Sequence, residues 1–142
     1  MRNFFTRNGH DLIDSIFKKL EEYFNKECFQ LVFIFGSFAC GRVAQESDID
    51  LAILFNKKPE IEKIIKISSD IPEITNRKAD IVILNDASPI IKMQVLKNGK
   101  ILKKQSDRIY SDFFIKTIKE YDDLKRIRKE AEKNILKGRI YA

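Results

Sequence analysis

Three aspartates are the residues of this chain whose type and spacing could do chemistry. Asp48 and Asp50 stand two positions apart at the start of an apolar run, and Asp80 opens a later apolar run. Side chains two apart in a strand point to the same face of a sheet. Two adjacent carboxylates repel each other and raise one another's pKa, and a bound divalent cation relieves the repulsion. The pair therefore predicts a Mg²⁺ site, because Mg²⁺ binds carboxylates together with substrate phosphates.

The third aspartate extends this interpretation. If the two apolar runs pair as strands, Asp80 lies about 5 Å across from the first carboxylates. Three carboxylates at one sheet edge can hold two metal ions roughly 3.5–4 Å apart, which is the arrangement for in-line displacement at phosphorus. We therefore expect Asp48, Asp50 and Asp80 to be both metal ligands and catalytic residues.

A glycine and a serine ahead of the aspartate pair could hold phosphate. Gly36 ends an apolar run, and we expect Ser37 to open a short helix. Glycine lets the backbone approach a phosphate closely, while amides at a helix start and the serine hydroxyl donate hydrogen bonds to its oxygens. Arg42 is a further candidate contact, because guanidinium groups bind phosphate strongly.

Apolar patterns predict the elements that position these residues. Residues 29–35 and 49–55 are short, β-branched and aromatic, which is typical of buried strands, and residues 79–84 predict a third strand. A short edge strand is expected at residues 101–102. Periodicity and start and stop signals predict helices over residues 11–26, from Pro59 in a first turn to about residue 75, from Ser88 to Asn98, and from about residue 107 to residue 137.

These elements predict an α+β (or α/β) chain with a small mixed sheet flanked by helices and a long C-terminal helix. One domain spans residues 1–142, with a core over about 10–104 and a helical extension over about 107–138. We expect two apolar faces to be buried. They are Ile61, Ile64, Ile65 and Ile71 in one helix, and Phe114, Ile118, Tyr121, Leu124, Ile127, Ala131 and Ile135 in the C-terminal one.

Composition is typical of a globular protein. The chain is 44% hydrophobic and 34% charged, without an apolar run of the roughly 20 residues that a membrane helix needs. The N-terminus lacks a signal-peptide pattern, so we expect a cytoplasmic protein with no membrane partner. The net charge of +6 favours anionic partners. Much of it comes from interleaved Lys and Glu, so we interpret it as a solvated surface and expect no direct nucleic-acid binding.

The motif resembles that of a known family. Gly36-Ser37, ten residues and then Asp48-x-Asp50 are similar to the signature of the polymerase β-like nucleotidyltransferases, and Ser47 and the following apolar strand match it too. Asp80 falls where that family has its third acidic residue. In size and layout the chain resembles the minimal nucleotidyltransferases that are paired with a HEPN-domain ribonuclease toxin.

The resemblance implies a specific reaction. Asp48 and Asp50 would bind two Mg²⁺ ions, and Asp80 would complete one metal site and help to deprotonate the acceptor hydroxyl. Gly36 and Ser37, with Arg42 and Ser47, would bind the nucleotide. AMP would pass from ATP to a hydroxyl, a tyrosine of the HEPN toxin, and pyrophosphate would be released. The toxin would be silenced, in an oligomer with this antitoxin.

One departure from the family pattern leaves alternatives open. Many members carry a basic residue before the second glycine, where this chain has Cys40; Arg42 is the candidate substitute. A second hypothesis is therefore an antitoxin that neutralises the toxin by binding alone. A third is nucleotidyl transfer to a small molecule or an RNA end, which ranks last because such enzymes generally carry extra domains for the acceptor.

Overall fold

A four-stranded sheet is the centre of the computed structural model, which describes residues 2–40 and 48–141, with side chains for residues 12–39 and 48–138. The strand order is β3-β2-β1-β4. β1 (Phe29–Phe35) pairs antiparallel with both β2 (Ile49–Phe55) and β4 (Lys100–Lys104). β2 pairs parallel with β3 (Ala79–Ile83), so the sheet is mixed. The predicted fold class is confirmed, and the expected edge strand exists as the longer β4.

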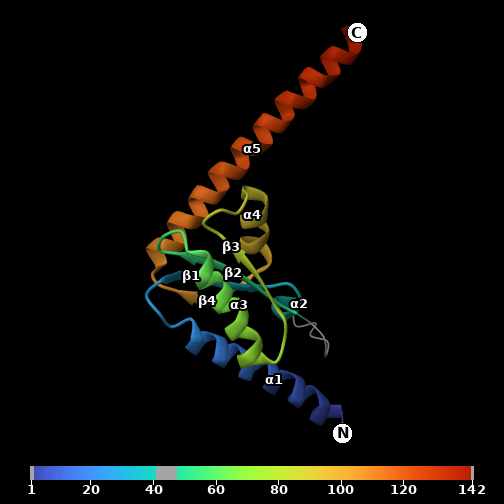
Figure 1. The fold of residues 1–142 in the computed structure, drawn as a ribbon. Coiled ribbons are helices and arrows are strands. Elements are labelled where there is room, and N and C mark those ends of the chain that lie inside the picture. Colours follow the sequence, from blue (N-terminus) through green and yellow to red (C-terminus); the bar gives the residue numbers. More distant parts are fainter. Residues whose placement is uncertain (1, 41–47, 142) are drawn as a thin grey trace.

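Two layers of helices cover the sheet (Figure 1). On one face, α1 (Arg2–Tyr23) and α3 (Ile61–Thr75) pack on the strands. On the other face lie α4 (Pro89–Asn98) and α5 (Asp107–Tyr141). The short α2 (Ser37–Cys40) follows β1 directly. No helix among residues 2–40 and 48–141 is long and apolar enough to cross a membrane.

Strand alternation divides the core between these layers. In β1, Val32 and Ile34 join the α1 and α3 side of the core, whereas Leu31 and Phe33 join the α4 and α5 side, and all four are at most 1% exposed. Because both faces are covered, the strands read as continuous apolar runs instead of alternating ones. Their bounds could therefore be predicted closely from the sequence.

The N-terminal helix corrects one prediction. α1 begins at Arg2, nine residues before the expected start, and His10 lies within the helix. The expected start rested on the apolar periodicity, which begins at Ile13, and Gly9 lies inside the observed helix. A glycine inside a helix costs only about 1 kcal/mol relative to alanine, and the helix continues through it. The buried positions Ile16 and Leu20 agree with the predicted periodicity.

The buried face of α3 is also corrected. Ile61 and Ile65 are 74% and 62% exposed, whereas Ile67, Ile71 and Thr75 are buried. The helix begins at Ile61 with Glu60 as its N-cap, so Pro59 lies before the helix and not in its first turn. The isoleucines of this helix do not all lie on one face, so they cannot all pack against the sheet. The face that contacts the sheet is the one with Ile67 and Ile71.

The long helix α5 (Asp107–Tyr141) is unbroken, and its buried residues differ from those that the sequence predicted. Phe113 and Thr117 are its buried residues, at 8% and 1% exposed, while Phe114 is 40% exposed. Ile127 and Ile135, which we expected in the core, are 63% and 58% exposed. The helix runs beyond the sheet (Figure 1), so nothing in the described chain lies beneath its second half.

Candidate active site

The sheet topology brings the ends of three strands to one edge. β1 runs antiparallel to β2, and β2 runs parallel to β3, so the end of β1 meets the starts of β2 and β3. Phe35 pairs with Asp50, and Asp50 pairs with Asp80, in one row across the sheet. A backbone hydrogen bond of 2.8 Å from Ile49 N to Lys78 O ties the two strand starts together. The predicted cross-strand placement of the second and third aspartates is confirmed.

Asp50 is the central carboxylate of this acidic edge, which we define as Asp48, Asp50 and Asp80. Burial raises the pKa of the half-buried Asp50 carboxyl above its usual range, and the charges of Asp80 and then Asp48 raise it further. Asp48 and Asp80 are both exposed. Electrostatic repulsion of this kind favours a bound cation. In residues 2–40 and 48–141, however, no three His, Cys, Asp or Glu side chains come together closely enough to hold a metal ion.

Gly36 makes room for Asp50. Its φ of 71° lies in the left-handed region, where side chains other than glycine are strained. A Cβ built on Gly36 would overlap Asp50 Oδ2 and lie 3.2 Å from Asp50 Cγ. Glycine is therefore required here twice, for its backbone angle and for the close approach of the carboxylate.

The short helix α2 starts at the residue after this glycine. Phe38 is 1% exposed and joins the core, which fixes α2 to the end of β1. Ala39 N donates a 3.2 Å hydrogen bond to Gly36 O. Ser37 is half-buried at the first position of α2, as the sequence predicted. Three other residues of the motif, Gly41, Arg42 and Ser47, lie outside the described residues.

Sequence reasoning missed one basic residue at this edge. Arg77 precedes β3, and its guanidinium carbon lies 5.2 Å from the centre of the Phe38 ring. This contact places a permanent positive charge beside α2 and three residues before Asp80. The available signal was the basic pair Arg77-Lys78 just ahead of the third aspartate.

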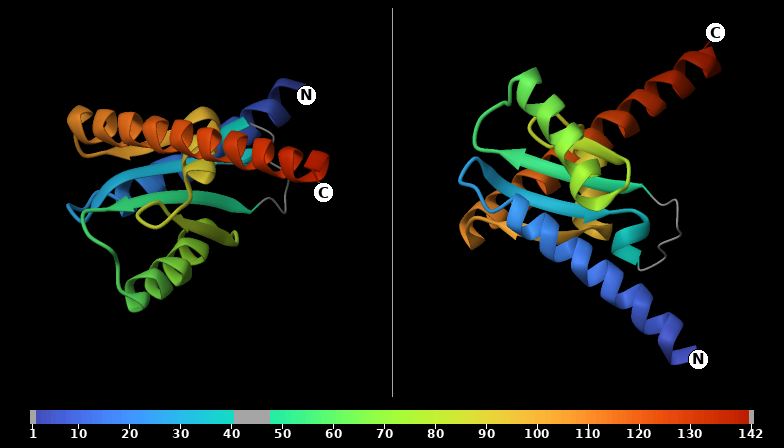
Figure 2. Two further views of the ribbon diagram at one scale, coloured as in Figure 1. Left: turned by 90° about the horizontal axis from the view of Figure 1, so that it is seen from above. Right: turned by 60° about the horizontal axis from the view of Figure 1, so that its bottom comes forward.

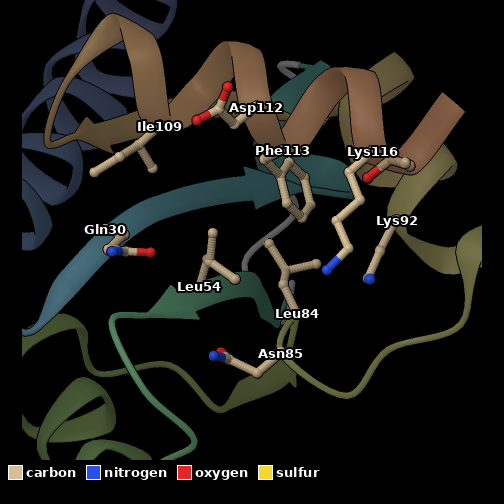
Figure 3. A pocket seen from close by; sticks show the side chains of 10 residues that line it. Gln30, Leu54, Leu84, Asn85, Lys92, Ile109, Asp112, Phe113 and Lys116 are labelled. Carbon is tan, nitrogen blue, oxygen red and sulfur yellow. The ribbon is translucent and has the colours of Figure 1, made fainter. Parts of the chain in front are cut away.

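A cavity of about 380 Å³ lies at the other end of the strands (Figure 3). It includes Leu54, near the end of β2, and it contains none of the predicted site residues. Figure 3 shows Lys92 and Lys116 with their side chains reaching toward the same opening. Lys92 Nζ is paired with Glu120 Oε2 at 3.3 Å, which neutralises one of these charges and joins α4 to α5. The cavity is separate from the acidic edge.

Comparison with known proteins agrees with this geometry. Residues 18–108 match the family model of polymerase beta, nucleotidyltransferase. Protein adenylyltransferase MntA of Shewanella oneidensis is 30% identical over 97 residues, covering 67% of this chain and 68% of the relative. Protein adenylyltransferase MntA of Aphanizomenon flos-aquae is 28% identical over 116 residues, covering 75% and 77% of the two chains.

A solved structure supports the same relationship. The crystal structure of a toxin-antitoxin with AMP-PNP superposes with a TM-score of 0.70 at 27% identity, covering 87% of this chain and 98% of that chain. The family model spans the sheet, the acidic edge and the glycine-serine turn. The chain belongs to the polymerase β-like nucleotidyltransferase family.

Proposed function

We propose that this chain is a Mg²⁺-dependent protein adenylyltransferase that transfers AMP from ATP to a tyrosine hydroxyl of a HEPN ribonuclease toxin and so acts as its antitoxin. The observation that carries the proposal is the row of Asp50 and Asp80 at one sheet edge, with Gly36 against Asp50. The similarity to protein adenylyltransferases and to a toxin-antitoxin bound to AMP-PNP supports it.

The donor set fits Mg²⁺, two ions in the proposed mechanism. Three carboxylates supply the hard oxygen ligands that Mg²⁺ prefers, and Asp50 carries the charge repulsion that a cation would relieve. Asp48, Asp50 and Asp80 would hold the metal. When bound, Mg²⁺ neutralises the charge of the phosphates and stabilises the transition state of displacement.

The chain's own residues would bind and orient the substrate. Ser37 and the neighbouring backbone amides would donate hydrogen bonds to the triphosphate, and Arg77 would add a positive charge beside α2. Arg42 and Ser47 remain proposed nucleotide contacts from the sequence. Gly36 would keep the backbone clear of Asp50, so that the carboxylate can face the substrate.

The transfer itself is a single displacement. The acceptor hydroxyl oxygen forms a bond to the α-phosphorus of ATP, and the bond from that phosphorus to the bridging oxygen breaks. Pyrophosphate leaves with the electron pair of the broken bond. Asp80 would accept the hydroxyl proton, because it is exposed at the edge where an acceptor can approach.

The test is incubation of the purified protein with α-labelled ATP, Mg²⁺ and the product of the adjacent gene, which the proposal expects to be a HEPN-domain protein. Label should appear on the partner and should disappear with Asp48→Asn/Asp50→Asn. A matched control is Asp112→Asn, an exposed carboxylate near the start of α5, beside the cavity at the other end of the strands. Labelling that survives in the double variant would exclude these aspartates as the catalytic residues.

A second candidate function is neutralisation of the toxin by binding alone. One observation favours it: the described acidic side chains do not already form a three-ligand metal site. Cys40 at a position that is basic in many family members points the same way. On this alternative, the Asp48→Asn/Asp50→Asn variant would protect cells from the toxin as well as the wild type does.

A further inference from the structure

The face of α5 that packs on the sheet continues as an exposed apolar stripe. Eighteen residues make five turns at 3.6 residues per turn, so Ala131 lies directly above Phe113 along the helix, and Ile135 lies directly above Thr117. Leu124 and Ile127 fall between them on the same side. We define the distal arm as residues 124–141 and its inner stripe as Leu124, Ile127, Ala131 and Ile135.

Burial along this one face changes sharply. Phe113 and Thr117 are 8% and 1% exposed, whereas Ile127 and Ile135 are 63% and 58% exposed. Leu124 is half-buried, and every side chain from Lys125 to Gly138 is exposed. Most of the stability of helices in proteins comes from packing of an amphipathic face. The stripe therefore has the pattern of a packed helix face but lacks a packing partner within the described chain.

The charge of the arm indicates what kind of partner fits. Among residues 124–138 of the arm, two acidic side chains, Glu130 and Glu132, are outnumbered by six basic ones, and Arg139 is a seventh basic residue in the sequence. The six are Lys125, Arg126, Arg128, Lys129, Lys133 and Lys137. In the part of the chain that the structure describes, Arg126 is the one of these six with an ion pair, at 3.2 Å from Asp123. Pairing with a second copy would bring two basic arms together, so an acidic surface is the favoured occupant.

The helix that carries the arm packs on the same face of the sheet as Asp50. α5 lies on the sheet face that carries Ala52, and strand alternation puts Asp50 on that same face. Both views in Figure 2 show α5 running toward the side where β1 ends and β2 begins. A protein held along the inner stripe would thus lie on the sheet face that carries Asp50.

We propose that the distal arm docks an acidic, amphipathic helix of the protein that receives the nucleotidyl group. The occupant's identity as the acceptor rests on the proposed function, but its chemistry follows from the stripe and its charge. Apolar side chains of the partner helix cover the inner stripe, and its carboxylates face the lysines and arginines around it. Docking holds the acceptor near the acidic edge and raises its local concentration there.

The test measures the affinity of the full chain for the HEPN-domain protein by titration calorimetry. Ile127→Ser/Ile135→Ser should weaken binding at least tenfold and lower labelling of the partner accordingly, while binding of Mg²⁺-ATP stays unchanged. Ile61→Ser/Ile65→Ser is the matched control, because it removes two isoleucines of similar exposure from α3 and should leave the affinity unchanged. Arg128→Glu should also weaken binding, and added salt should reduce the wild-type affinity.

Each outcome separates docking from chemistry. Unchanged affinity in Ile127→Ser/Ile135→Ser, or no binding by the wild type, would overturn the docking proposal. A self-dimer in light scattering that only this variant breaks would overturn it in favour of a second copy. RNA retention that only this variant loses, with partner affinity intact, would overturn it in favour of nucleic acid. Binding that depends on the stripe but never leads to label would uphold docking and reject the transfer reaction.

Discussion

The acidic edge and the distal arm differ in how their key residues are supported. At the acidic edge, Asp50 is flanked by paired strands on both sides and by Gly36 at close range. On the distal arm, Ile127 and Ile135 project from a single helix without contact from another element of the described chain. The first region positions polar groups within a sheet, and the second presents apolar groups to the surroundings.

Each region keeps side chains in an unfavourable environment, and the kind of side chain differs between the two. Burial and the charges of Asp80 and Asp48 disfavour the ionised form of Asp50, and the paired strands hold Asp50 next to Asp80 despite this cost. Exposure of the inner stripe leaves apolar surface in water, which is unfavourable. On the two proposals above, a cation would relieve the first cost and an apolar partner surface would relieve the second.

Neutralising Asp50 should give the largest effect and should separate activity from stability. If Asp50 holds Mg²⁺ as proposed, Asp50→Asn should lower transfer by on the order of 10³, because a bound metal ion contributes several kcal/mol to the transition state. Without Mg²⁺ the variant should melt at a higher temperature than the wild type at neutral pH, because the repelled charge is gone. Calorimetry in a chelator and the labelling assay measure the two effects.

The pH dependence of that stability difference follows from the sign of the shift. A raised pKa in the fold means that ionised Asp50 destabilises the native state at neutral pH. The advantage of the Asn variant should therefore shrink as the pH falls through the raised pKa and the wild-type carboxyl gains its proton. A lower melting temperature of Asp50→Asn at neutral pH would contradict this account of the acidic edge.

Alanine at two glycines, one in each region, should have opposite effects. Gly36→Ala should destabilise the fold by about 1–2 kcal/mol from the left-handed backbone alone. It should also lower transfer by on the order of 10², because it displaces Asp50. Gly138→Ala meets no atom within 4 Å and should stabilise the helix by up to about 1 kcal/mol. Urea unfolding followed by far-UV circular dichroism would measure the stability of both variants. A change of the same sign and size in the two variants would contradict the predicted difference between the two glycines.

Arg77 should matter for nucleotide binding and not for folding. If its charge contacts the triphosphate, Arg77→Ala should raise the KM for ATP about tenfold, since hydrogen bonds to charged groups contribute about 1.5–3 kcal/mol. Arg77→Lys should recover part of the loss. Lys78→Ala, which removes the neighbouring exposed charge, is the control. A KM unchanged in Arg77→Ala would contradict a role of this residue in nucleotide binding.

The smallest effect should come from the contact between α1 and α3, away from both regions. Tyr23 donates a 2.7 Å hydrogen bond to Asp70 Oδ2, so Tyr23→Phe should cost about 0.5–1.5 kcal/mol of stability. Burial and Asp70 raise the pKa of the Tyr23 hydroxyl. Wild-type stability from this group should therefore be present below pH 10 and decline above it, and the variant should lack that decline. Transfer activity should remain unchanged.

Several features of the site could be predicted from local sequence. The strands at residues 29–35 and 49–55 were predicted with their observed bounds, because short β-branched runs between polar turns have few other structures available. Ser88 caps α4 as its side chain predicted, accepting a 3.3 Å hydrogen bond from Ile91 N. The division of the chain into a core and a helical extension, and the roles of Arg42 and Ser47, stay predictions.

The sequence by itself determined which residues could do chemistry, because Gly36-Ser37 and Asp48-x-Asp50 need only their spacing along the chain to be recognised. Only the tertiary structure decided which apolar faces are covered. Ile61, Ile65, Ile127 and Ile135 have the same side chain as the buried Ile67 and Ile71, and periodicity cannot distinguish them. Burial depends on what lies opposite in space, and for these helices that was set by the sheet and by where it ends.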